Sequence, residues 1–241
     1  MELRWDRLNW QDFEDLQKKG YDRVILPLGT IEAHGVIPLG TDNIIPENIA
    51  QRIAPDIKAI IAPTVSYGVT RSLLHYPGSL SVSSPTLKAY IFEILSSMVS
   101  KGMEKIVIIN GHGGHMDELK QIAFEIHEKT RAKVIVIHWW ILCQDLGPEI
   151  YDTEGGHAAV DETAAIIASA PETVKKDKYS LDMLYHFRQG VNVYPSPSTI
   201  IIYKENTGAL DFDAKKADDY FKAVCQKVKD FILDIFERWD K

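Results

Sequence analysis

Two short segments hold most of the residue types that bind metal ions in proteins. The first is Gly29-Thr-Ile-Glu-Ala-His-Gly-Val-Ile-Pro-Leu-Gly-Thr-Asp42, and the second is Asn110-Gly-His-Gly-Gly-His115. Each follows an apolar run typical of a buried strand, which is where α/β proteins place their ligand-binding residues. Carboxylate oxygens and imidazole nitrogens together suit Zn²⁺, Mn²⁺ or Fe²⁺. The two segments therefore predict a metal-dependent hydrolase.

The first segment offers three candidate ligands. Glu32 and His34 are separated by one residue, so they either share one centre or diverge toward two adjacent metal positions. Asp42 follows behind the turn-like Pro38-Leu-Gly-Thr, which can bring its carboxylate back to the same centre. Because a carboxylate has two oxygens, Asp42 could bridge two cations.

Two further segments add candidates. His112 lies between Gly111 and Gly113, whose lack of a side chain allows close approach of an ion or ligand. The segment Gly155-Gly-His-Ala-Ala-Val-Asp-Glu-Thr163 places His157 in a glycine-rich loop and Glu162 at the start of a predicted helix. Together the segments provide nitrogen and oxygen ligands for a metal centre.

A structural role is the alternative for each of these residues taken singly. The two acids of the first segment could be a helix cap and a surface carboxylate, the histidines could hold loops, and Glu162 could be a solvated helix residue. Their joint occurrence at strand ends favours a metal site, because unpaired carboxylates in one cleft repel each other unless a cation neutralises them.

Strands and helices alternate along the chain. Short apolar runs predict strands at 23–28, 58–62, 105–109 and 133–137. Helical periodicity and capping signals predict helices at 10–19, from Pro46 through Ile53, and at 85–99, 119–126, 161–170 and 213–239. Residues 182–207 lack a clear period, so we expect loops with some short strands. This alternation predicts an α/β fold with a largely parallel sheet covered by helices on both faces.

Composition excludes several functional classes. The 241 residues, 45% hydrophobic, suit one compact domain over 1–241. The net charge of -7 and the absence of a basic run argue against nucleic-acid binding, and no stretch is apolar enough to insert in a membrane. Cys143 and Cys225 form no CxxC pair, and the first 20 residues lack a signal-peptide core, so we expect a cytoplasmic protein.

The motifs resemble those of the creatininase (creatinine amidohydrolase) family. The matching segments are Leu28-Gly-Thr-Ile-Glu-Ala-His-Gly, Pro38-Leu-Gly-Thr-Asp42, Asn110-Gly-His-Gly-Gly114 and His157-Ala-Ala-Val-Asp-Glu-Thr163, in register over about residues 23–165. The resemblance implies a three-layer α/β/α sandwich, commonly a homohexamer, that acts on a small-molecule substrate. It also implies hydrolysis of a C–N bond with two divalent metal ions per chain.

The resemblance also implies roles for individual residues. Asp42 would bridge the two ions, Glu32 and His112 would hold one, and His34 and Glu162 would hold the other. His157 would be the acid–base residue, with the alternative that it only holds the loop at Gly155-Gly156. Candidates for substrate binding, which could instead stabilise loops, are His75, Ser79, Gly113 and Gly114.

Departures from the family pattern bear on the substrate. Creatininases carry a Tyr-Glu pair where this chain has Gly113-Gly114, and that Glu is a metal ligand, so Glu162 must take its role here. This weakens the case for creatinine itself. Related members include a formamidopyrimidine deformylase and a peptidase that acts on a redox-cofactor precursor.

The sequence disfavours two other classes of function. A catalytically inactive metal-binding scaffold is disfavoured because all the predicted ligands are present. A nucleotide-binding module is disfavoured because neither G-x-G-x-x-G nor G-x-x-x-x-G-K-(S/T) occurs at a strand-to-helix turn. Trp139 and Trp140 follow a predicted strand and either cover the pocket or pack in the core.

Overall fold

Four parallel strands form the central sheet. In the computed structural model, which describes residues 1–241, they are β1 (Arg23–Leu28), β2 (Ala59–Ile61), β3 (Lys105–Asn110) and β4 (Lys133–His138). Their order across the sheet is β2-β1-β3-β4. The four predicted strands are confirmed, and their ends differ from the prediction by at most one residue.

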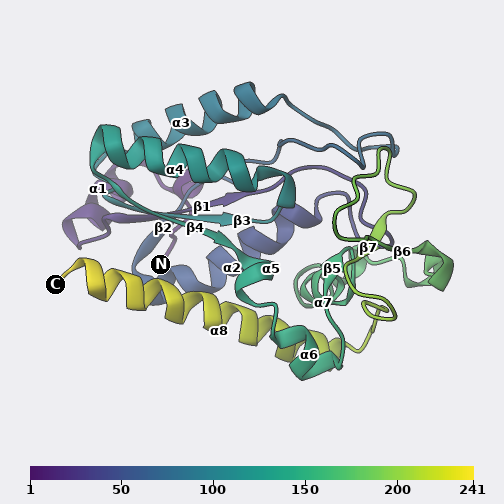
Figure 1. Ribbon diagram of the computed structural model, residues 1–241. Coiled ribbons are helices and arrows are strands. Elements are labelled where there is room, and N and C mark those ends of the chain that lie inside the picture. The colour runs from purple at the N-terminus through teal and green to yellow at the C-terminus, as the bar shows by residue number, and fades with distance from the viewer.

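Helices cover both faces of the sheet (Figure 1). On one face α3 (Ser84–Ser100) packs beside α4 (Met116–Thr130). On the other face lie α2 (Thr41–Ile57) and the long α8 (Ala214–Trp239), with α7 (Val160–Ser169) packed against both. The predicted three-layer α/β/α sandwich is therefore confirmed. None of the helices combines the length and apolar character needed to cross a membrane.

The strand order places a crevice between the ends of β1 and β3. From β1 the chain passes through α2 to β2 on one side, and it then returns through α3 to β3 on the other side. Leu28 pairs with Asn110, and Asn110 pairs with His138, so the carboxyl ends lie level. Ligands of open α/β sheets bind where the strand order reverses in this way. Both candidate metal segments begin at this crevice.

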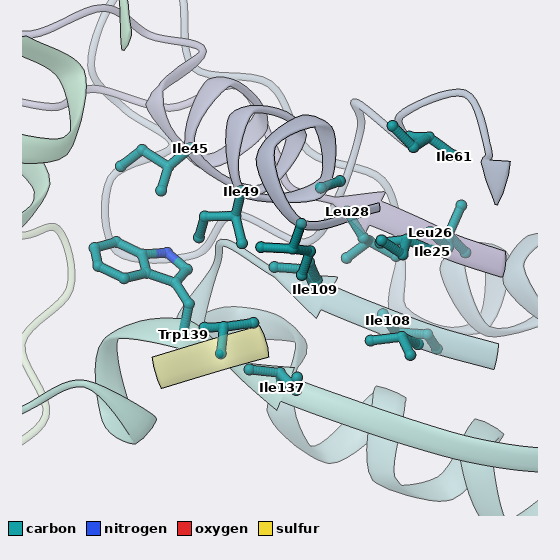
Figure 2. Packing of buried hydrophobic residues seen from close by; sticks show 14 of the residues in the cluster. Ile25, Leu26, Leu28, Ile45, Ile49, Ile61, Ile108, Ile109, Ile137 and Trp139 are labelled. Carbon is teal, nitrogen blue, oxygen red and sulfur yellow. The ribbon is translucent and has the colours of Figure 1, made fainter. Parts of the chain in front are cut away.

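A continuous apolar core joins the sheet to its helices. Figure 2 shows Ile25, Leu26 and Leu28 of β1 packed near Ile109 of β3 and Ile49 of α2. These side chains are fully or almost fully buried. Because the sheet is covered on both faces, its strands are continuous apolar runs rather than alternating ones.

Helix α2 begins earlier than the sequence predicts. The expectation of a start at Pro46 is wrong by five residues, since the helix starts at Thr41, whose hydroxyl donates a hydrogen bond of 2.7 Å to the Pro38 carbonyl. Pro46 lies inside the second turn and lacks the N–H that would bond the Asp42 carbonyl. Asp42 therefore lies in the first helical turn, with its carboxylate near the positive end of the helix dipole.

A second, smaller sheet lies beyond the carboxyl ends of the main strands. It contains β5 (Gly156–His157), β6 (Leu184–His186) and β7 (Ile200–Ile202) in the order β5-β7-β6. The expected short strands within 182–207 are thus confirmed. One of them, β7, pairs with the segment that contains His157, and His157 lies opposite Ile201. No local feature of the sequence predicts this pairing. The remaining helices are α1 (Trp10–Lys18), α5 (Trp139–Leu142) and α6 (Leu146–Tyr151).

Truncation of a core leucine provides a test of this packing. Leu26 is 0% exposed, so Leu26→Ala should lower the free energy of unfolding by roughly 2–5 kcal/mol, because it removes buried methyl groups and leaves a cavity. The matched control Leu181→Ala, at a site 67% exposed, should change it by less than about 0.5 kcal/mol. Urea denaturation followed by circular dichroism measures both values, and equal midpoints would contradict this description of the core.

Candidate metal centre

The loop after β1 presents Glu32 and His34 from a rigid turn. The backbone N–H of Ala33, between them, donates a 3.0 Å hydrogen bond to the Ser79 hydroxyl, and the Glu32 N–H donates to the Leu39 carbonyl at 3.0 Å. The side chains of Glu32 and His34 are almost completely buried. Both functional groups are therefore held in fixed positions beneath the crevice.

Asp42 lies between two histidines. Its Oδ1 is 2.9 Å from His34 Nε2, and its Oδ2 is 3.0 Å from His112 Nδ1. The start of α2 brings the carboxylate to this position, as the turn Pro38-Leu-Gly-Thr predicts. Asp42 is consequently the one carboxylate that reaches both halves of the site.

Backbone carbonyls fix the tautomers of these two histidines. His112 Nε2 donates to the Val69 carbonyl at 2.9 Å, and His34 Nδ1 donates to the Glu32 carbonyl at 3.0 Å. A neutral imidazole that donates from one nitrogen keeps a lone pair on the other. His112 Nδ1 and His34 Nε2 therefore face the carboxylates as potential metal ligands. The amide of Asn110 supports the same loop, since it donates to the His112 carbonyl at 2.8 Å.

The third segment closes the site from the side of the small sheet. Glu162, in the first turn of α7, accepts a 2.6 Å hydrogen bond from the Ala158 N–H and has Oε2 3.7 Å from His34 Nε2. His157 Nε2 donates to the Ala33 carbonyl at 2.9 Å, and its ring packs 4.2 Å from that of His34. This leaves His157 Nδ1 facing Glu32 Oε1 at 3.6 Å.

Burial and charge shift the pKa values strongly in this cluster. Burial raises the pKa of Glu162 to about 8, although the charge of His34 opposes the shift. Burial also disfavours a charged His34, but the carboxylates of Asp42 and Glu162 outweigh this and raise its pKa to about 10. Burial and the charge of His34 lower the pKa of His157 to about 4. The carboxylates of Glu32, Asp42 and Glu162 are thus buried close together, and each is stabilised by nearby positive charge.

The donor atoms fit divalent cations. Three sets each have all their ligand atoms within 4.8 Å of one another, namely Glu32, Asp42 and His112, then His34, Asp42 and Glu162, and also Glu32, His34 and His157. His34 Nε2 and Asp42 Oδ2 are buried and make no hydrogen bond. Their nearest polar neighbours are Asp42 Oδ1, 2.9 Å from His34 Nε2, and His112 Nδ1, 3.0 Å from Asp42 Oδ2. Buried polar atoms without partners are costly, and a bound cation would satisfy both.

The other predicted site residues lie at varied distances from this cluster. Gly113 lines a narrow cleft of about 50 Å³ above it, beside Asp42 and His112. A Cβ at Gly114 would lie 2.5 Å from the Val69 carbonyl oxygen and would overlap the His112 ring, so glycine is required there. Ser79 contacts the backbone of the Glu32 loop. His75 is exposed and packs against Tyr76, outside the residues that line the cleft, so its role in substrate binding stays a prediction.

Sequence reasoning missed residues that complete the cleft. Tyr203, just after β7, lines it opposite Trp140. The pairing of β7 with β5 brings Tyr203 there, and nothing in the local sequence signals a contact between segments so far apart. Of the two tryptophans, Trp139 is fully buried in the core, whereas Trp140 lines the cleft. His115, to which the sequence assigns no role, accepts a 3.0 Å hydrogen bond at Nε2 from the Val69 N–H.

The sequence is similar to proteins of the creatininase family. A family model described as creatinine amidohydrolase matches residues 6–232. The creatinine amidohydrolase of Pseudomonas putida is 28% identical over 192 residues, which cover 71% of this chain and 73% of that protein. A mycofactocin precursor peptide peptidase of Mycolicibacterium smegmatis is 30% identical over 162 residues, covering 64% of this chain and 61% of the peptidase.

Solved structures share the fold. A crystal structure of creatinine amidohydrolase superposes with a TM-score of 0.84 at 23% identity and covers 98% of both chains. Creatininase structures described as Zn-Zn type and as Mn have TM-scores of 0.81 and 0.78, at 23% and 22% identity, and each covers 98% of this chain and 99% of its own. Because the family model spans nearly the whole sequence, the chain belongs to the creatininase family.

Proposed function

We propose that the protein is a metal-dependent amidohydrolase that cleaves a C–N bond in a small amide, cyclic amide or formamide. The observation that supports this most is the position of Asp42, which belongs to both the Glu32–His112 set and the His34–Glu162 set. Glu32, Asp42 and His112 would hold one divalent cation, and His34, Asp42 and Glu162 would hold another. The Zn and Mn forms of related creatininases support the choice of such metals.

Divalent cations in this site would acidify a water molecule and polarise a substrate carbonyl. The chain's own residues contribute orientation and proton transfer. The carbonyls of Val69 and Glu32 hold the His112 and His34 rings so that neither can rotate away. His157, whose pKa is lowered to about 4 by burial and whose Nδ1 lies 3.6 Å from Glu32 Oε1, would take up a proton and pass it to the departing nitrogen.

The structure constrains the identity of the substrate less than it constrains the metal ligands. The Gly113-Gly114 pair offers the cleft no side chain where creatininases have Tyr-Glu, which argues against creatinine as the physiological substrate. A formamide is the alternative, and the M. smegmatis relative makes a short peptide a second candidate. A metal-binding scaffold without activity is the competing class. By family resemblance we also propose a homo-oligomer, which light scattering would test.

Metal analysis tests the centre directly. Protein reconstituted with Zn²⁺ or Mn²⁺ should hold about two ions per chain, and Asp42→Asn should lose at least one because it weakens the only ligand shared by both sets. The matched control is Asp145→Asn at an exposed position whose carboxylate pairs with Lys227. Elemental analysis after gel filtration gives the stoichiometry, and a wild-type protein that binds no metal would refute the proposal.

Replacement of His157 separates catalysis from loop support. With metal content matched to the wild type, His157→Ala should lower kcat by roughly 100-fold or more, because the leaving nitrogen would lose its proton donor. His127→Ala, at an exposed position in the last turn of α4, serves as the matched control. If kcat stays unchanged, His157 only anchors its loop to the Ala33 carbonyl.

A substrate screen distinguishes the chemical alternatives. Metal-reconstituted protein should hydrolyse small formamides or cyclic amides, with release of amine or formate, better than it hydrolyses creatinine. The physical reason is that Gly113-Gly114 leaves the cleft without the side chains that creatininases place there. Enzyme-like turnover of creatinine would contradict this inference while leaving the amidohydrolase assignment intact.

A further inference from the structure

A larger cavity opens directly beside the metal-centre cleft. It has a volume of about 460 Å³ and shares Trp140, Gly156 and Tyr203 with the cleft. A group bound at the cluster could therefore extend into this cavity past the two aromatic rings. The cavity is large enough for part of a small molecule, whereas the cleft of about 50 Å³ holds little more than the reacting group.

The buried carboxylate of Asp161 lines this cavity. Asp161 is 7% exposed, and one of its oxygens accepts a 3.0 Å hydrogen bond from the Gly156 N–H. A Cβ at Gly155 would overlap this carboxyl group, so the glycine allows the loop to close over it. The hydrogen bonds to this carboxylate come from backbone N–H groups, no side chain donates to it, and Asp161 lines the cavity.

No cation of the protein neutralises Asp161. The other carboxylate in the cavity wall, Glu154, pairs with Lys204 at 2.9 Å, and the nearby Asp145 pairs with Lys227. Asp161 forms no such ion pair. A buried carboxylate without a cationic partner is costly, and such a group is retained where a ligand supplies the missing charge or donor.

The walls around this carboxylate suit a positively charged nitrogen group. Trp140, Tyr203 and Tyr220 present aromatic rings to the cavity. The faces of such rings attract cations, and their apolar surface accepts a short alkyl chain. A neutral apolar group would gain only the second of these interactions and would leave the Asp161 carboxylate without a cationic partner.

We propose that this cavity is a specificity subsite and that Asp161 selects amides that carry a second, cationic nitrogen group apart from the scissile bond. The scissile carbonyl would lie at the Asp42 cleft, and a primary ammonium or an amidinium on a short chain would reach Asp161 past Trp140. This inference rests on the proposed amidohydrolase function for its kinetic consequence, but binding at the subsite does not require turnover.

The test compares substrates that differ only in charge. We would measure kcat/KM of the metal-reconstituted enzyme for monoformamides of short diamines, with linkers of about two to four methylene groups, and for isosteres in which methyl replaces the ammonium. We expect a preference of roughly tenfold or more for the cationic member of the best pair. Asp161→Asn should abolish the preference, because the amide oxygen can still accept from Gly156 but the charge is gone. Asp145→Asn, which removes an exposed carboxylate that pairs with Lys227 and does not line the cavity, is the matched control and should retain the preference.

A binding measurement keeps this inference separate from the proposed function. The monoacetyl amide of the best diamine serves as a slowly hydrolysed probe, and its affinity for the wild type and for Asp161→Asn is measured by calorimetry. Tighter binding of the cationic probe than of its methyl isostere, lost in Asp161→Asn, would support the subsite even if no amide were hydrolysed. Equal kcat/KM for both formamides, or equal affinity for both probes in the wild type, would overturn it while the amidohydrolase proposal could still stand. The wild-type comparison decides the outcome if Asp161→Asn does not fold.

Discussion

The gathering of three carboxylates in a buried crevice is the constraint on which the site depends. Glu32, Asp42 and Glu162 are each at most 6% exposed, and a low-dielectric setting strengthens their mutual repulsion. The histidines of the cluster offset part of this charge only when they are protonated. Divalent cations would offset it without protonation and would leave the imidazole lone pairs free to bind them. The cluster is therefore better explained as a cation site than as a hydrogen-bonded polar core.

The same constraint accounts for the backbone around the site. Strongly charged side chains can be held this close only if their loops are fixed. The side chains of Ser79 and Asn110 fix the loops together with backbone groups. Val69 illustrates this, because its carbonyl accepts from His112 while its N–H donates to His115. The backbone of this one residue, between β2 and α3, thus fixes the position and the tautomer of His112, a candidate ligand in the loop after β3.

The sequence could predict the sheet and the five ligand candidates because those signals are local. Apolar runs mark β1 and β3, and the glycine-flanked acids and histidines follow them directly. It could not predict Tyr203, since the residue reaches the cleft only through pairing of β7 with β5 across a long separation. The start of α2 was misplaced for a different reason. Proline is common in the first turn of a helix, and here Pro46 lies further inside.

The position of Pro46 in the second turn of α2 also explains why Gly29 and Gly111 flank the cluster of candidate ligands. With no N–H at Pro46, the Asp42 carbonyl is left outside the helical hydrogen-bond ladder and packs against the backbone at Gly29 and Gly111. A Cβ at either glycine would overlap this carbonyl group. The start of α2 can therefore approach the ends of β1 and β3 closely enough for the Asp42 carboxylate to lie between His34 and His112. The glycines of the two motifs allow this close packing of helix on strand, and the arrangement of the candidate metal ligands follows from it.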